Sequence, residues 1–231
     1  MLNVICLKHG VKYDSVYVNK LYNMIQRNLT ISHNFICFTD DPAGINPSIE
    51  IKLLPNLQFE GWWWKPYIFK HDHFCSGDIN LFFDLDMVII KNIDHLATYL
   101  PEKFVGLRDV GRVFVPDIKK LGSAVMKWPA GQFSNVWTNL ENNVSLCKRF
   151  RGDQDWIWYE IHNQVCFFPD DWIRSYKWEI RSRNELTDFG PNSTFSTIKD
   201  PYISPNTSVL AFHGNPKIHN ISDPVIVNNW Q

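Results

Sequence analysis

The chain has 231 residues, a length that fits one domain, and its 45% hydrophobic and 20% charged residues are typical of a globular protein with its own core. The formal net charge of -1 argues against nucleic-acid binding, because a phosphate-binding surface normally carries an excess of Lys and Arg. No apolar stretch reaches the roughly 20 residues that span a bilayer. The unusual feature is the aromatic content of 15%, with ten Trp, which indicates an aromatic core or a flat binding surface.

The five cysteines are odd in number, and no two have a Cys-x-x-Cys spacing. This pattern argues against both a disulfide framework and a zinc knuckle. The first ten residues lack a basic segment and a small-residue cleavage site, so we interpret them as a strand and not as a leader. The expected location is therefore the cytoplasm.

The N-terminal segments alternate between strand and helix patterns. Residues 4–7 form a short apolar run, and apolar residues then recur at helical spacing over 15–29, with Ser15 as the expected N-cap. Residues 34–39 form a second apolar run that ends before an acidic turn. Strand, helix and strand in this order predict a βαβ unit and a parallel sheet.

Further elements are predicted downstream. Residues 49–54 are expected to form a strand, 66–74 a helix with Pro66 in its first turn, and 79–90 a long apolar strand. Beyond Pro101 the pattern is less regular, with short strands at 104–107, 124–127 and 165–168 and a helix near 154–160. These patterns predict a Rossmann-like first half followed by a mixed second half in one globule.

Asp84 and Asp86 interrupt the long apolar strand. In an extended chain, residues i and i+2 project to the same side, so the two carboxylates should be neighbours while Leu85 faces the other way. Neighbouring carboxylates in apolar surroundings repel each other unless a cation lies between them, and Mn²⁺ or Mg²⁺ suits such oxygen ligands. The alternative is that the pair ends the strand at the surface. We favour metal binding because apolar residues continue over 87–90.

The segment around Asp84 and Asp86, together with other parts of the sequence, resembles a known family. Residues 81–88 resemble the Asp-x-Asp strand of GT-A-fold glycosyltransferases, particularly the glycogenin/galactosyltransferase-like family 8 and its small bacterial relatives. Five further segments resemble family motifs in the same order along the chain. Residues 6–22 and 37–41 resemble the segments that bind the nucleotide, and residues 61–65 the segment that places a basic residue on the donor. Residues 152–155 resemble the acceptor-side Asp-Gln motif, and residues 212–217 the C-terminal His-Gly-Lys motif. The resemblance therefore covers nearly the whole chain.

The resemblance implies an α/β fold of the GT-A type, a Rossmann-like half with a mixed sheet in an α/β/α sandwich. It implies a single domain over 1–231, with about 1–100 binding the nucleotide-sugar and about 101–231 binding the acceptor. The implied activity is metal-dependent transfer of a hexose from a nucleotide diphosphate sugar to a hydroxyl of a carbohydrate or other acceptor. A UDP-sugar donor, Mn²⁺ (or Mg²⁺) as cofactor, and retention of anomeric configuration are expected.

The resemblance also assigns roles to residues. Asp84, Asp86 and His213 are expected to hold the metal, and Asp153 and Gln154 to be catalytic. The residues expected to bind the nucleotide-sugar are Lys8, Gly10, Tyr13, Asp40, Lys65, Asp84, Ser123, Gly214 and Lys217. Two details depart from the family pattern. His213 and Lys217 are four residues apart where six is usual, and Ser123 lies in Gly-Ser-Ala where the family often has Asn-Ser-Gly.

Other interpretations remain open. Trp62, Trp63 and Trp64 cannot all face inward from one element, so at least one should be exposed or line a cleft. A nucleotidyltransferase shares a related sheet and metal chemistry, and a non-catalytic carbohydrate-binding relative would keep the Trp surface. The sequence contains no P-loop, G-x-G-x-x-G or G-x-S-x-G motif, which removes the usual support for a kinase, a dehydrogenase or an α/β-hydrolase.

Overall fold

The structure is a computed structural model, and it describes residues 1–57, 59–181 and 202–231. Its strands are β1 (Leu2–Lys8), β2 (His33–Thr39), β3 (Glu50–Leu53), β4 (Ile79–Phe83), β5 (Met87–Ile89), β6 (Phe104–Arg108), β7 (Leu121–Pro129), β8 (Val165–Phe167), β9 (Ile173–Ser175) and β10 (Val209–Ala211). The α-helices are α1 (Ser15–Asn28), α2 (Asp94–Thr98), α3 (Asn135–Asn142), α4 (Asp153–Ile161) and α5 (Pro224–Asn229). The short 3₁₀ helices are η1 (Gly61–Phe69), η2 (His71–His73), η3 (Val110–Val113), η4 (Val144–Lys148), η5 (His162–Gln164) and η8 (Ile218–Asn220), and η6 (Tyr176–Arg181) is a π-helix.

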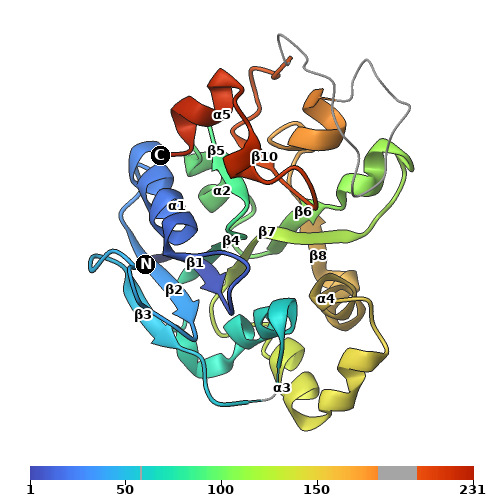
Figure 1. The fold of residues 1–231 in the computed structure, drawn as a ribbon. Helices are drawn as coiled ribbons and strands as arrows, with labels where there is room; N and C mark the ends of the chain where they lie inside the picture. Colours follow the sequence, from blue (N-terminus) through green and yellow to red (C-terminus); the bar gives the residue numbers. More distant parts are fainter. Residues whose placement is uncertain (58, 182–201) are drawn as a thin grey trace.

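Seven of the described strands form one sheet in the order β3-β2-β1-β4-β7-β6-β8 (Figure 1). Strands β1 to β4 run parallel, as the βαβ pattern predicted, whereas β7 is antiparallel to both β4 and β6. The chain adds β2 and β3 on one side of β1 and then returns to add β4 on the other. The carboxyl ends of β1 and β4 therefore meet at a topological switch point, the place where open α/β sheets bind ligands.

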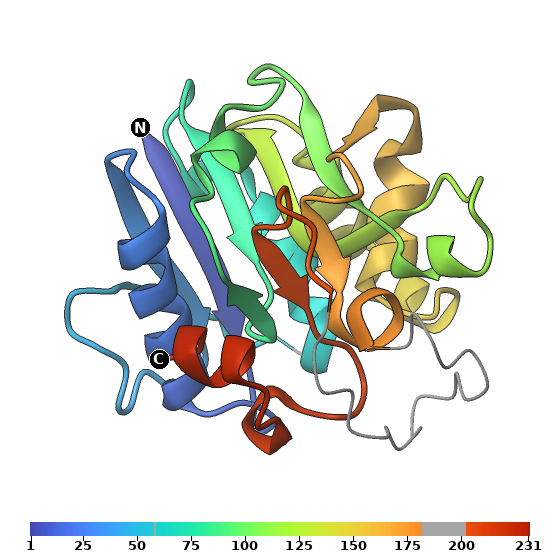
Figure 2. The same cartoon turned by 90° about the horizontal axis from the view of Figure 1, so that it is seen from above.

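Hydrophobic residues of the sheet alternate between two cores. In β1, Val4 and Cys6 pack into one core with α1, while Ile5 packs into the other with η1, α3 and α4. This alternation follows from the two-residue period of a strand, and it requires helices on both faces. Figure 2 shows α1 and α5 on one side of the sheet and α4 on the other.

The predicted strand over 79–90 is wrong as a single element. Strand β4 ends at Phe83, and β5 joins a separate three-stranded sheet in the order β5-β10-β9. The backbone N–H of Asp84 still donates to Ala124 O at 2.8 Å, but the chain then leaves the main sheet. Apolarity continues through the break because β5 is buried in the core that contains α1. The apolar pattern indicated that these residues are buried, but it did not indicate that β5 pairs with β10 and not with a strand of the main sheet.

Two smaller predictions are also corrected. The N-cap of α1 is Asp14, whose carboxylate accepts from Val16 N, and Ser15 is the first helical residue. The predicted helix over 66–74 is instead a 3₁₀ helix that already begins at Gly61, followed by η2. The predicted strand at 49–54 and the elements of the second half are confirmed within a few residues. Among the described residues, no helix combines the length and apolarity needed to cross a membrane.

Candidate functional site

A pocket of about 280 Å³ lies at the switch point between β1 and β4. We call it the switch-point pocket. It is lined by Leu7, His9, Lys12, Tyr13, Gly61, Trp62, Lys65, Asp84, Leu85 and Asp86. The residues come from three segments far apart in the sequence, which the parallel pairing of β1 with β4 and the packing of η1 bring together.

Asp84 and Asp86 both line this pocket and are half-buried, while Leu85 between them is buried in the core. The predicted neighbouring of the two carboxylates is therefore confirmed, although they occupy the connection between two strands. Burial raises the pKa of Asp84 to about 7, with repulsion from Asp86 and Asp153 acting in the same direction and Lys65 opposing it. Burial also raises the pKa of Asp86. Both carboxylates thus lie where negative charge is poorly solvated.

Lys65 connects Asp84 to the second half of the chain. Its ammonium lies 2.9 Å from Asp84 Oδ1 and 3.0 Å from Asp153 Oδ2, and it donates to Ser123 Oγ at 3.1 Å. The Ser123 hydroxyl donates in turn to Asp153 Oδ2 at 2.6 Å. Burial lowers the pKa of Lys65, but the two carboxylates outweigh burial and the net shift is upward, so the side chain stays charged. Four of the predicted site residues therefore form one buried network.

Asp86 belongs to a second group at the other side of the pocket. Tyr13 donates its hydroxyl to Asp86 Oδ2 at 2.7 Å, and Lys217 Nζ donates to the Tyr13 hydroxyl at 3.3 Å. The ammonium groups of Lys12 and Lys217 lie 5.2 and 5.4 Å from the centre of the Tyr13 ring. Burial and repulsion by Lys12 lower the pKa of Lys217, while Asp86 opposes them. Two cations thus lie beside the acidic pair.

His213 is brought near the acidic pair by its backbone. Strand β10 pairs antiparallel with β5, and the N–H of Phe212 donates to Asp86 O at 3.0 Å. The imidazole itself contacts other residues, with Nε2 2.7 Å from Ser175 Oγ and the ring edge-on to that of Trp178, the two ring centres 4.3 Å apart. Burial lowers the pKa of His213 to about 4. Among the described residues, no group of three His, Cys, Asp or Glu side chains is arranged to hold a metal ion, so the predicted triad is not assembled in this conformation.

A second pocket of about 280 Å³ lies at the start of α4. We call it the α4 pocket. It is lined by Asp109, Lys120, Arg151, Gly152, Gln154 and Asp155. Gln154 donates its amide to Asp109 Oδ2, and Lys120 pairs with Asp155 at 2.6 Å. Asp153 and Gln154 are thus adjacent in sequence but face different partners, since Asp153 joins the Lys65 network.

The other predicted binding residues lie around the same sheet edge. Lys8 ends β1 and donates its ammonium to Asp41 O at 3.0 Å, and Asp40 follows β2 and accepts from Gly10 N at 3.0 Å. Gly10 and Gly214 both have φ of +65°, a conformation that favours glycine. The contacts of Lys8, Gly10 and Asp40 connect the loops that follow β1 and β2, and the roles of all four residues in binding stay predictions.

Six residues that line the switch-point pocket were not selected as site residues from the sequence, namely Leu7, His9, Lys12, Gly61, Trp62 and Leu85. Lys12 and His9 lie in the segment that resembles the nucleotide-binding loop, but no spacing rule distinguished them from a solvated surface. The Trp run did signal that one indole should be exposed, without indicating which one.

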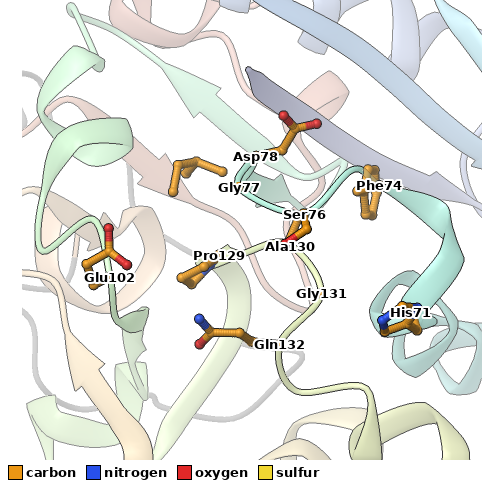
Figure 3. A pocket seen from close by; sticks show the side chains of 11 residues that line it. His71, Phe74, Ser76, Gly77, Asp78, Glu102, Pro129, Ala130, Gly131 and Gln132 are labelled. Atoms are coloured by element: carbon orange, nitrogen blue, oxygen red, sulfur yellow. The ribbon is translucent and has the colours of Figure 1, made fainter.

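A further cavity of about 330 Å³ lies at the N-terminal end of β4 and the C-terminal end of β7, where Asp78 and Pro129 line it (Figure 3). Glu102 and Gln132 line one side of it and His71 the opposite side. Asp78 is already paired with the N-terminal ammonium at 2.9 Å. This cavity is remote from the carboxyl ends of the parallel strands, so we do not assign the function to it.

Comparison of the sequence with protein-family models and with curated proteins gives no match. Solved structures do match. The galactosyltransferase LgtC, in complex with donor and acceptor sugar analogs, aligns with a TM-score of 0.62 and 12% identity over 94% of this chain and 88% of LgtC. The glycosyltransferase GlyE of Streptococcus pneumoniae TIGR4 aligns with a TM-score of 0.64 and 11% identity over 99% of this chain, which spans 60% of GlyE. These similarities confirm the predicted GT-A-like α/β fold.

Proposed function

We propose that the chain is a glycosyltransferase that moves a hexose from a nucleotide diphosphate sugar to a hydroxyl acceptor. A UDP-sugar is the expected donor, and retention of anomeric configuration is the expected outcome. One observation supports the proposal above the others. Within a fold shared with LgtC and GlyE, the side chains of Asp84, Asp86 and Lys65 meet in the pocket at the sheet's switch point.

The acidic pair fits a divalent cation. Both carboxylates are half-buried in one pocket, and each is only partly compensated, Asp84 by Lys65 and Asp86 by the Tyr13 hydroxyl. Oxygen ligands of this kind suit Mn²⁺ or Mg²⁺. We propose that Asp84 and Asp86 hold the ion, with His213 as a further ligand from the neighbouring segment. When bound, the ion would offset negative charge on the departing diphosphate.

The remaining groups of the pocket suit the other parts of the donor. Lys12 and Lys217 place two cations beside Asp86, and these would pair with the negative charge of a diphosphate bound in the pocket. Lys65 holds Asp84 and Asp153 in one network with Ser123, so that the metal-binding and acceptor-side carboxylates keep a fixed relation. We propose that Asp153 and Gln154 contact the reacting sugar and the acceptor, as the Asp-Gln resemblance implies.

Calorimetry tests the donor and metal assignments together. UDP, GDP and CDP are titrated into the protein with and without Mn²⁺. We expect one nucleotide, UDP, to bind in an Mn²⁺-dependent manner, and Asp84→Asn and Asp86→Asn to weaken that binding at least tenfold, or about 1.4 kcal/mol, because each removes one charged oxygen ligand.

The matched control for these variants is Asp117→Asn, which changes an exposed carboxylate outside the lining of either pocket. It should bind like the wild type, and circular dichroism should show all three variants folded. Undiminished affinity in both site variants would refute the metal assignment, and a wild-type protein that binds no nucleotide would refute the proposed function.

A further inference from the structure

Trp62 is the exposed member of the Trp run. Its side chain is 54% exposed, whereas Trp64 is 2% exposed and packs in the core below η1. Gly61, with a φ of +56°, begins the 3₁₀ helix, and along this helix the side chains pass from exposed at Trp62 to buried at Trp64. Single exposed apolar side chains are common on protein surfaces, but this indole also lines a pocket, where an aromatic surface can contact a ligand.

The indole of Trp62 lies between the two pockets. It lines the switch-point pocket, and its edge packs against Gly152, which lines the α4 pocket. A Cβ atom at Gly152 would lie 3.1 Å from Trp62 Nε1 and 3.4 Å from Cδ1, so a larger residue would require the indole to shift by a few tenths of an ångström. The backbone at the start of α4 thus fixes the edge of the indole while a large part of its surface stays exposed.

The surroundings combine one flat apolar surface with several hydrogen-bonding groups. On the α4 side these are the carboxylates of Asp109 and Asp155, the Gln154 amide and the cations of Lys120 and Arg151. A pyranose ring has matching properties, because its C–H face can stack on an aromatic ring while its hydroxyls bond to polar side chains. A serine hydroxyl of a peptide or a lipid alcohol would use neither the stacking surface nor this number of polar groups.

We infer that Trp62 and the α4 pocket form the acceptor subsite, and that the acceptor is a carbohydrate ending in a pyranose. The inference rests on the proposed function and narrows its acceptor class. We assign the stacked ring to the acceptor and not to the donor because Trp62 contacts Gly152, directly before Asp153 and Gln154, whereas the cations beside Asp86 lie around Tyr13.

Saturation-transfer NMR tests the subsite without any need for turnover. The probes are methyl β-D-galactopyranoside, methyl α-D-glucopyranoside and methyl α-D-mannopyranoside. At least one should bind the wild type and receive most saturation at the protons of one ring face. Trp62→Ala should weaken that binding at least tenfold, while Trp62→Phe, which keeps an aromatic face, should stay within about threefold of the wild type.

Two further variants sharpen the test. Tyr159→Ala removes another exposed aromatic side chain, which is 62% exposed, lies on α4 and lines neither pocket. This variant should bind the probes like the wild type. Gly152→Ala keeps Trp62 and crowds only the edge of its indole, so it should weaken binding less than Trp62→Ala does.

The outcomes separate this inference from the proposed function. Unchanged pyranoside binding in Trp62→Ala, or a wild type that binds none of the three probes, would overturn the subsite even if UDP binds with Mn²⁺. Trp62→Ala that weakens a UDP-hexose relative to UDP, with pyranoside binding unchanged, would assign the indole to the donor and also overturn it. Failure of the proposed function would appear instead as absent nucleotide binding in the calorimetric titrations.

Discussion

Lys65 shows how one residue can determine the electrostatics of a site. The residue is 6% exposed, and its ammonium is shared between two carboxylates that come from opposite halves of the chain. Removing one member of a buried charged group leaves the others uncompensated, which usually costs several kcal/mol. Because the cation is shared with Asp153, it does not fully offset the burial of Asp84, and the pKa of Asp84 remains high. A bound metal ion would offset the negative charge of Asp84 that Lys65 leaves uncompensated.

A substitution at Asp153 can distinguish a catalytic role of this residue from a structural one. Helix capping is the ordinary structural role of an Asp at the start of a helix, but the N-cap of α4 is Gly152, and the Asp153 carboxylate contacts Lys65 and Ser123. We expect Asp153→Asn to lower kcat at least tenfold on a folded protein, because the amide cannot replace the charge. Thermal unfolding measured beside kcat provides the check. Wild-type kcat in this variant would reject the catalytic role.

His213 is expected to act as a metal ligand only after its side chain turns. In this conformation its Nε2 faces Ser175, although its segment pairs with the strand that follows Asp86. We expect His213→Ala to reduce Mn²⁺ affinity and to narrow the preference for Mn²⁺ over Mg²⁺, because imidazole nitrogen suits Mn²⁺ better. Metal titrations in the presence of UDP measure both. Lower stability with an unchanged metal preference would show that His213 serves the core alone.

At the scale of elements, η2 places a histidine among aromatic rings. His73 lies edge-on to Phe38 and Tyr67, with ring centres 4.9 and 4.6 Å away. Burial lowers the pKa of His73 from its ordinary value of 6.5 to about 4, with Lys52 and Lys70 contributing and Asp72 opposing. The folded protein therefore keeps this imidazole neutral in mildly acidic solution.

This shift predicts a pH-dependent stability. Between pH 6.5 and about 4 the unfolded chain binds a proton at His73 that the folded chain does not, so the free energy of unfolding should fall as the pH is lowered through this window. His213 and His95, whose pKa values are also lowered by burial, act in the same direction. Urea unfolding at several pH values should show a shallower loss in His73→Gln than in the wild type. An identical slope in the variant would contradict the assignment.

At the scale of the whole molecule, the sheet separates two cores. Ile25 of α1 is buried in one core and Ile157 of α4 in the other. Deleting one methylene from each should cost about 0.5–1.5 kcal/mol, because an Ile→Val change leaves a small cavity.

We expect the effects of Ile25→Val and Ile157→Val to add within about 0.5 kcal/mol in the double variant, since the two sites share no packing partners. Urea unfolding of both single variants and the double variant measures this. A larger deviation would show that the sheet transmits strain from one core to the other.

The sequence by itself determined the elements whose signal is local. Continuous apolar runs predicted β1 and β2, helical spacing predicted α1, and the spacing of Asp84 and Asp86 predicted that both carboxylates face one side, where both line the switch-point pocket. The two strands and the helix could be predicted because apolar runs and side-chain direction along an element follow from local sequence and backbone geometry. The two carboxylates share the pocket although their segment lies between β4 and β5 and is not itself a strand.

Only the tertiary structure decided how distant segments meet. Apolarity alone did not show that the chain changes sheets after Phe83, because a buried strand is equally apolar in either sheet. Nor did it show that Lys65 is shared between Asp84 and Asp153, that the His213 imidazole faces Ser175, or that Trp62 rests on Gly152. Each of these contacts joins residues more than ten positions apart. Their geometry depends on strand pairing and packing across the whole chain, which no local pattern encodes.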